Sequence, residues 1–339
     1  MGPRPAPFPV GLSIVIPVYQ ARDCLVPLAD AIDAALAQSG LAREVILVND
    51  GSTDGSWGVI AGLCRSRPGY VGIDLRRNFG QDNAIMTGLR AARGEAVAIM
   101  DDDLQHDPRD LPALLEPLAS DGVDVVYADF RTKHQAAWKN LGSWFNGKCA
   151  EWVLDKPKGL YLSPYKVIRK EVVDLICRHD GPEPYIDGLL LQVTWRIAQV
   201  PAEHCPRHVG QSSYTFARSL RVWARLATSF SVRPLRLVIW VGLALAMAGT
   251  ALATLVIVYR LRRPESFERA VAGWASLMVA ALLTAAVVLV FLGVIGEYAG
   301  RTYLSVCRKP QAAVREILGA EPDDGARGLT ATTASNGEG

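Results

Sequence analysis

The stretch Ala96-Val97-Ala98-Ile99-Met100-Asp101-Asp102-Asp103-Leu104-Gln105 places three acids at the end of an apolar run. The apolar residues predict a buried strand. Alternate side chains of an extended chain point the same way, so Asp101 and Asp103 can reach one hard cation together while Asp102 faces elsewhere. Gln105 adds a neutral oxygen, and the pattern predicts a Mg²⁺ or Mn²⁺ site beside a diphosphate. The alternative is an acidic turn that caps a helix over Arg109 to Leu118.

Strand and helix patterns alternate on both sides of this run. Short apolar, β-rich stretches predict strands over Leu12–Pro17, Glu44–Val48, Val71–Leu75, Ala96–Met100 and Val123–Tyr127. Helical patterns between them predict helices over Asp23–Gln38, Ser56–Arg65, Asp82–Ala92 and Arg109–Ala119. This alternation predicts an α/β domain with a Rossmann-like, mainly parallel sheet covered on both faces. Ligands bind beyond the carboxyl ends of such strands, so the loops that follow the strands are the expected site.

Polar residues gather in those loops. Asn49-Asp50-Gly51-Ser52-Thr53-Asp54-Gly55 follows the second strand, where Asp50 can accept hydrogen bonds from a nucleobase or ribose and Asp54 can cap the next helix. Arg76 and Arg77 follow the third strand and can pair with a phosphate or with the three acids. No G-x-G-x-x-G motif is present, so a dinucleotide site of the Rossmann type is not expected.

The carboxyl-terminal part of the chain is apolar enough to enter a membrane. Half of the residues are hydrophobic and the mean hydropathy is +0.16. Leu237–Tyr259 and Ala270–Gly296 carry no charge, and each is long enough as a helix to cross a hydrocarbon core of about 30 Å. Buried core helices of a large soluble domain are the alternative. Met1 to Pro9 has no apolar segment of the signal-peptide type, so the residues before the first span are expected to stay on the side where they are made.

Basic residues near the two spans predict the orientation. They are more numerous outside the connecting loop, at Arg218, Arg221, Arg225, Arg233, Arg236, Arg301, Arg308 and Lys309, than within it, at Arg260, Arg262, Arg263 and Arg269. The positive-inside rule then predicts a multi-pass protein of the cytoplasmic (inner) membrane with both termini in the cytoplasm. The six cysteines contain no C-x-x-C pair, which indicates reduced thiols and argues against a zinc site.

The expected organisation has five parts. Residues 1–214 form the cytoplasmic domain, 237–296 the two spans with a short outer loop, and 319–339 a disordered tail. Residues 215–236 form an amphipathic, Arg-rich helix that either lies in the membrane interface or docks on the soluble domain. Residues 297–318 are expected to form a second interfacial helix.

Six motifs, in order along the chain, carry a family resemblance. They are IPVYQARD, VNDGSTDGS, RNFGQDNAIMTG, DDDLQHDP, RHVGQSSYTF and, after the two spans, GVIGEYAGRTY. The chain resembles the family 2 glycosyltransferases of the GT-A fold that charge polyprenyl phosphates, which include dolichyl-phosphate mannose synthase, undecaprenyl-phosphate aminoarabinose transferase and bactoprenol glucosyltransferase. The resemblance covers about residues 10 to 312.

The resemblance implies roles for individual residues. Asp101, Asp103 and Gln105 would hold the divalent cation against the donor diphosphate. The nucleotide and donor site would comprise Pro17, Tyr19, Asp50, Arg77, Gln81 and Asp101. The acceptor phosphate would meet Arg131, Lys139 and Ser212. Arg207, on a loop that closes over donor and acceptor phosphates, would act in catalysis together with Asp103 and Asp187.

Two departures from the resemblance concern the catalytic base. The segment Lys158-Gly159-Leu160-Tyr161 lacks an acid that relatives carry, and Ser213 replaces a usual Lys. Asp187 matches an acid position of the dolichyl-phosphate mannose synthases, where it would act as base or position a substrate; the alternative is an acid at a helix N-terminus. A phosphate nucleophile is already largely ionised near neutral pH, so a strong base is not required.

The resemblance implies an inverting, metal-dependent enzyme that transfers one sugar from a nucleotide sugar, with uridine the expected base, to polyprenyl (undecaprenyl) phosphate for cell-envelope glycan or lipid modification. Its partners would be these two substrates and the membrane, with a separate flippase downstream and no nucleic acid; homo-oligomer formation stays open. The alternatives are a processive polysaccharide synthase and a non-catalytic membrane scaffold. Gln192-Val193-Thr194-Trp195-Arg196 lacks the order of the synthase motif Gln-x-x-Arg-Trp, and the clustered acids have no use in a scaffold.

Overall fold

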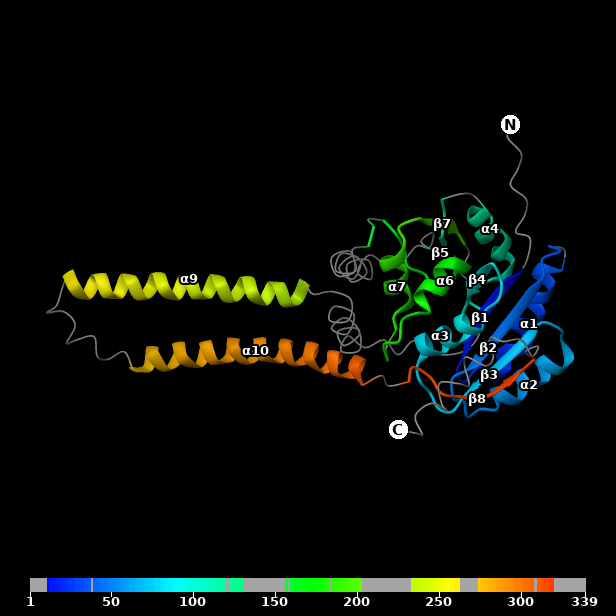
Figure 1. Ribbon diagram of the computed structural model, residues 1–339, viewed down its shortest axis with the longest axis horizontal. Coiled ribbons are helices and arrows are strands. Elements are labelled where there is room, and N and C mark those ends of the chain that lie inside the picture. Colours follow the sequence, from blue (N-terminus) through cyan, green and yellow to red (C-terminus); the bar gives the residue numbers. More distant parts are fainter. Residues whose placement is uncertain are drawn as a thin grey trace, which may run out of the picture. The chain divides into compact units, whose positions relative to one another are not determined.

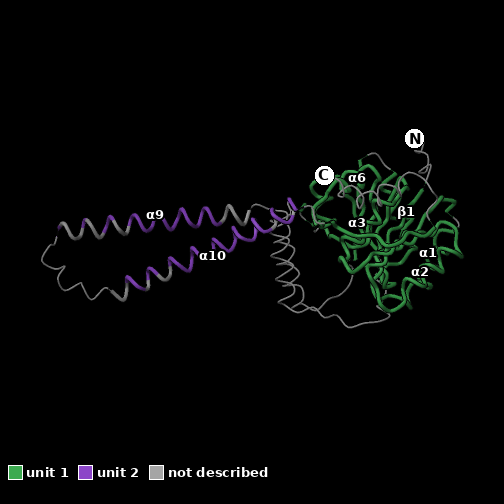
Figure 2. Tube along the Cα trace, turned by 60° about the horizontal axis from the view of Figure 1, so that its bottom comes forward, with its two compact units in different colours: residues 1–213, 308–339 green, residues 214–307 purple. Residues whose placement is uncertain are grey.

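The computed structural model describes residues 11–37, 39–119, 122–130, 156–157, 159–182, 184–202, 233–262, 274–307 and 310–319. The chain divides into two compact units, residues 1–213 with 308–339 and residues 214–307, coloured separately in Figure 2. The first unit contains the sheet and the second contains two long helices (Figure 1).

The described part of the first unit is built on one sheet in the order β7-β5-β6-β4-β1-β2-β3-β8. The strands are β1 (Leu12–Val18), β2 (Arg43–Asn49), β3 (Tyr70–Leu75), β4 (Ala96–Ile99), β5 (Val125–Asp129), β6 (Lys166–Arg169), β7 (Ile197–Pro201) and β8 (Val314–Leu318). The pairs β1–β2, β1–β4, β2–β3 and β5–β7 are parallel, whereas β4–β6, β5–β6 and β3–β8 are antiparallel. The predicted α/β class with a mainly parallel sheet is therefore confirmed.

Helices cover both faces of this sheet (Figure 1). They are α1 (Arg22–Leu36), α2 (Ser56–Ser66), α3 (Gln81–Ala91), α4 (Leu111–Leu115), α6 (Lys170–Ile176) and α7 (Ile186–Val193), with 3₁₀ turns η1 (Pro108–Asp110) and η2 (Pro117–Ala119). Every residue of β1 is buried, because its alternate side chains pack on opposite helices. Ile14 and Ile16 join the core with Leu25 of α1, whereas Val15 meets α3 at Gly88, where an added Cβ would lie 2.4 Å from Val15.

The sequence predicted the elements up to β5 more accurately than those that follow. The five expected strands and the first three expected helices are present, with ends shifted by one or two residues. The helix expected over Arg109–Ala119 is instead divided into η1, α4 and η2, because Pro112 and Pro117 each lack the backbone N–H that a continuous helix needs. The elements β6, α6, α7 and β7 were not anticipated.

The expected interfacial helix over residues 297–318 is wrong in its second half. Helix α10 ends at Val306, and Val314–Leu318 forms β8, which pairs antiparallel with β3 at the sheet edge (Figure 1). The sequence Val-Arg-Glu-Ile-Leu suits both a helix and a strand. The unpaired edge of β3 decides between them, because its backbone groups gain partners only if these residues are extended.

The second unit contains α9 (Arg233–Arg262) and α10 (Trp274–Val306). Within the described residues, one stretch, Thr284–Leu304 of α10, has the length and apolar composition needed to cross a membrane. The apolar stretch Val238–Ala251 of α9 is shorter. The helix expected over 215–236 lies outside the described residues except for its last residues in α9, and the tail over 319–339 lies outside them after Gly319.

We expect Glu44→Ala to lower the free energy of unfolding by about 2–3 kcal/mol. The buried Glu44 carboxylate accepts the Ser13 hydroxyl (2.6 Å), the Arg93 backbone N–H (2.6 Å) and Arg93 Nε (3.0 Å). Removing it leaves the buried Ser13 hydroxyl and the partly buried Arg93 N–H groups without this acceptor. Denaturant melts followed by circular dichroism would measure the loss, with the exposed Glu171→Ala as a control that changes stability by less than about 0.5 kcal/mol. Equal free energies of unfolding for the two variants would contradict the prediction.

Candidate active site

A polar cavity lies at the carboxyl edge of the parallel strands. Because β1, β2 and β4 run parallel, the loops that follow them open at the same edge. The cavity has a volume of about 290 Å³. It is lined by Pro17, Val18, Tyr19, Asp50, Asn78, Gly80, Gln81, Asp101, Asp102 and Asp103. The three acids and the segments after three strands therefore meet, as the sequence predicted.

The three adjacent acids all line this cavity, each with a different donor. Gln81 Nε2 donates to Asp101 (2.8 Å), the Tyr19 backbone N–H donates to Asp102 (3.0 Å) and the Gln105 backbone N–H donates to Asp103 (3.1 Å). The expectation that Asp102 faces elsewhere is wrong. Strand β4 ends at Ile99 and the chain then bends, so the alternation of an extended chain no longer applies.

A buried histidine holds the acidic loop in place. His106 Nδ1 accepts the Asp101 backbone N–H at 3.0 Å, so the proton of the neutral ring lies on Nε2. The ring stacks on Tyr165 (centroids 5.0 Å apart) and on Phe130 (5.8 Å). The Tyr165 hydroxyl donates to the Asp107 carbonyl oxygen at 3.1 Å. The loop that follows β4 is thus anchored to the residues next to the start of β6 and the end of β5, and not only to its own strand.

The three acids of the cavity lie close enough to influence one another's ionisation. Burial, together with the neighbouring carboxylates of Asp103 and Asp102, raises the pKa of Asp101 to about 7. Lys166 on β6 acts in the opposite direction and lowers this pKa. Near neutral pH the Asp101 carboxyl is therefore ionised only in part, and a bound cation would favour its ionised form.

Asp50 joins two loops of the site. Its carboxylate accepts the backbone N–H of Phe79 (2.7 Å) and of Gly80 (2.9 Å), and burial, opposed by these two bonds, raises its pKa. The next residue, Gly51, has φ +68°, and an added Cβ would lie 2.5 Å from the Asn78 backbone nitrogen. The residue there must therefore be glycine for the 49–55 loop to approach the 76–80 loop.

Two predicted residues stand apart from the cavity lining. Arg77 is exposed, and its guanidinium stacks over the Phe79 ring at 4.4 Å. Gln105 meets Asp103 through its backbone, and the side-chain amide beside Asp101 is that of Gln81. Asn78 and Gly80 line the cavity without having been singled out, although the motif RNFGQ contains both.

Asp187 is engaged in an internal ion pair. It lies in the first turn of α7, where it contacts buried Lys166 Nζ and accepts the Tyr127 hydroxyl at 2.9 Å. Lys166 Nζ also lies 5.2 Å from the Tyr127 ring centroid. Lys166 could not be singled out from the sequence, because it sits within an ordinary β-rich stretch. The lysine that pairs with Asp187 is also the one whose charge lowers the pKa of Asp101 in the cavity.

Four residues with expected phosphate roles lie outside the described residues: Arg131, Lys139, Arg207 and Ser212. Their roles stay predictions.

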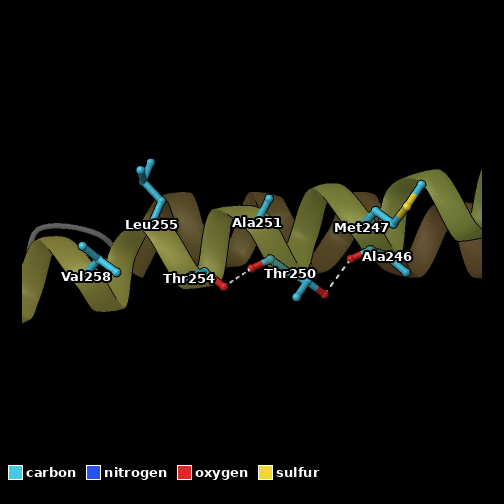
Figure 3. A pocket seen from close by; sticks show the side chains of 7 residues that line it. All are labelled: Ala246, Met247, Thr250, Ala251, Thr254, Leu255 and Val258. Carbon is cyan, nitrogen blue, oxygen red and sulfur yellow. Dashed lines mark hydrogen bonds between the residues drawn. The ribbon is translucent and has the colours of Figure 1, made fainter.

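Helix α9 carries a second, open concave surface of about 710 Å³ (Figure 3). It is lined by Ala246, Met247, Thr250, Ala251, Thr254, Leu255 and Val258. The Thr250 and Thr254 hydroxyls donate to carbonyl oxygens one turn earlier in the helix, at 2.9 and 2.8 Å. The surface is therefore apolar, and its lining offers no charge to an anionic ligand.

Comparisons with known proteins place the chain in a family. The profile of glycosyl transferase family 2 matches residues 13–172. The chain is 32% identical to undecaprenyl-phosphate 4-deoxy-4-formamido-L-arabinose transferase of Pseudomonas aeruginosa (strain LESB58), over 93% of this chain and 93% of that protein. The chain belongs to glycosyl transferase family 2. This glycosyltransferase is also 30% identical to the protein of the same name from Yersinia pestis (strain Pestoides F), over 91% of this chain and 94% of that protein.

Among solved structures, this glycosyltransferase is similar to glucosyl-3-phosphoglycerate synthase from Mycobacterium tuberculosis in complex with Mn²⁺ and uridine-diphosphate-glucose. The TM-score is 0.48 at 21% identity, and the match covers 66% of this chain and 79% of that one. The family resemblance drawn from the six motifs is confirmed by the sequence relatives.

Proposed function

We propose that this glycosyltransferase transfers a single sugar from a nucleoside diphosphate sugar to a polyprenyl phosphate, with inversion at the anomeric carbon. The supporting observation is the acidic cavity after β1, β2 and β4, in a chain whose relatives carry undecaprenyl phosphate in their names. A uridine nucleotide is the proposed donor base, by family analogy.

The residues of the cavity fit a divalent cation by their chemistry. Carboxylate oxygens are the ligands that Mg²⁺ and Mn²⁺ prefer, and the raised pKa of Asp101 indicates charge that a cation would balance. No group of three or more His, Cys, Asp or Glu side chains is already gathered as a metal cluster among the described residues. We therefore propose that Asp101 and Asp103 turn toward the ion when the donor binds, with Gln105 as a third oxygen ligand.

The proposed reaction needs positioning and charge neutralisation more than a strong base. A phosphate oxygen of the acceptor attacks the anomeric carbon, a new C–O bond forms, and the bond from that carbon to the donor diphosphate breaks. The bound cation would offset the charge of the leaving diphosphate. Asp50 and Gly51 would hold the loop under the nucleotide, with Pro17 and Tyr19 beside it. Arg131, Lys139, Arg207 and Ser212 would meet the phosphates, as the resemblance implies.

The membrane part would bring the acceptor to the site. We propose two spans, in α9 and α10, with the first unit and both termini in the cytoplasm. The uncharged character of both stretches, 237–259 and 270–296, favours anchoring over transport, because transport requires polar groups within the membrane. A separate flippase would then move the product to the other leaflet.

Incubating membranes that contain the full chain with labelled nucleotide sugars and undecaprenyl phosphate tests the function. We expect one labelled monosaccharide that extracts with the lipid. A polymer would indicate a processive synthase, and the absence of product with every donor would indicate a scaffold. The exposed Asp174→Asn variant on α6 serves as an active control beside Asp103→Asn. Helix α6 begins beside the start of β4, whereas the acids follow the other end of that strand.

A further inference from the structure

The segment after the second long helix returns to the sheet. We call residues 310–319 the C-terminal strap. Its strand β8 pairs with β3 from Gly72 to Leu75, and the Arg76 backbone N–H donates to the Ala313 carbonyl oxygen at 2.8 Å. The strap therefore lies beside the strand that leads directly into the 76–80 loop of the acidic cavity (Figure 1).

Arg315 of the strap contacts a buried carboxylate of β3. Its Nη1 lies 3.2 Å from Asp74 Oδ2, and its Nη2 donates to the Arg76 carbonyl oxygen at 3.1 Å. The Asp74 side chain is only 2% exposed, and its Oδ2 makes no hydrogen bond within the described residues. A buried carboxylate is costly unless a positive charge or donors balance it, so the guanidinium of Arg315 matters more than an ordinary surface charge.

The other oxygen of Asp74 is hydrogen-bonded toward the 49–55 loop. Asp74 Oδ1 accepts Asn49 Nδ2 at 2.7 Å, and Asn49 Oδ1 accepts the Ser52 backbone N–H at 3.3 Å. The Ser52 hydroxyl in turn accepts the Gln20 backbone N–H at 3.1 Å. One series, an ion pair from Arg315 to Asp74 followed by hydrogen bonds, thus runs from the strap to the loop that contains Asp50 and Gly51.

We propose that Arg315 is a positioning residue for the nucleotide of the donor, acting through Asp74 and Asn49. This inference rests on the proposed function, because it assumes that the 49–55 loop binds the nucleotide. Without Arg315, the Asp74 carboxylate lacks its balancing charge, and its hydrogen bond with the Asn49 amide is no longer held in the same geometry. The start of the 49–55 loop is then held less firmly, so binding of the donor should weaken. The rate of the chemical step at the acids should stay nearly unchanged.

A second contact of the strap supplies the matched control. Gln311 is buried, and its Nε2 donates to the carbonyl oxygens of His179 (2.9 Å) and Gly181 (2.5 Å). Gln311→Met removes these donors at similar size and loosens the strap without touching Asp74. An effect that comes only from a loose strap would appear equally in Gln311→Met and Arg315→Met.

The experiment compares full-length wild type, Arg315→Met, Arg315→Lys and Gln311→Met by nucleotide Kd, donor KM, kcat and Tm. We expect Arg315→Met to raise the Kd and KM by about 5- to 20-fold with kcat within about twofold, and Arg315→Lys to recover most of the loss. Gln311→Met should lower Tm but leave the donor KM within about twofold. In Asn49→Ala, adding Arg315→Met should have little further effect on KM, because both act in one series.

Equal KM changes in Arg315→Met and Gln311→Met, additive effects with Asn49→Ala, or a loss confined to kcat would overturn the inference. If the wild type makes product and the Arg315→Met variant has the same nucleotide Kd and donor KM, the inference is overturned and the proposed function stands. Wild-type protein that binds no nucleotide would overturn the proposed function and this inference together.

Discussion

Replacing Asp103 by alanine should reduce sugar transfer by at least about 10³-fold, because the leaving diphosphate then loses the cation that balances its charge. Excess chelator should abolish transfer in the wild type, and added Mg²⁺ or Mn²⁺ should restore it. Asp101→Ala should behave alike. The measurement is the rate of lipid-extractable label with the donor that the wild type accepts.

The fold should survive this change. Asp103 is one of three crowded acids, and removing one relieves repulsion that already contributes to the raised pKa of Asp101. Circular dichroism and Tm should therefore stay near those of the wild type, as for the Asp174→Asn control. Full activity of the wild type in excess chelator would exclude the metal assignment, and a large fall in Tm would show that Asp103 is structural.

Replacing Lys166 by methionine should destabilise the first unit by about 3–5 kcal/mol, which corresponds to a fall in Tm of roughly 10 °C. Lys166 is buried between β4 and β5, and its loss leaves the Asp187 carboxylate without its balancing charge. Thermal and denaturant melts of the full-length protein would measure the change.

Two further variants separate charge from packing. Lys170→Met breaks the exposed pair with Asp174 and should cost no more than about 1 kcal/mol. Adding Asp187→Leu to Lys166→Met removes the orphaned carboxylate and should recover much of the stability. A Lys166→Met protein that melts like the wild type would contradict the prediction. Activity of the Asp187→Asn variant per folded molecule would also show whether Asp187 is needed in the reaction.

The sequence was sufficient for the first half of the sheet. The strands from β1 to β4 are mostly apolar and are buried along almost their whole length, since both their faces are covered, and such runs separated by helical patterns allow few other structures. The acids after β4 and the loop after β2 follow strands directly. Parallel strands bring such loops to one edge, so the site could be located without knowing any side-chain contact.

The sequence was less informative where the partner of a residue is remote in the chain. Lys166 carries no pattern of its own, and its role depends on Asp187, which α7 brings to it. His106 lies within a motif, but only Phe130 and Tyr165 show that it anchors the acidic loop. The divided segment over residues 108–119 was open to prediction, because Pro112 and Pro117 within it were visible in the sequence.

The sequence by itself determined the order of strands and helices from β1 to β4, the edge at which the acids gather and, through its motifs, the family. These depend on local periodicity and on residues that follow a strand within a few positions. Only the tertiary structure decided that Asp102 enters the cavity, that Asp187 is paired with Lys166, and that Val314–Leu318 is a strand carrying Arg315 to Asp74. These depend on which remote backbone edge or buried charge needs a partner, and short-range patterns contain no information about that.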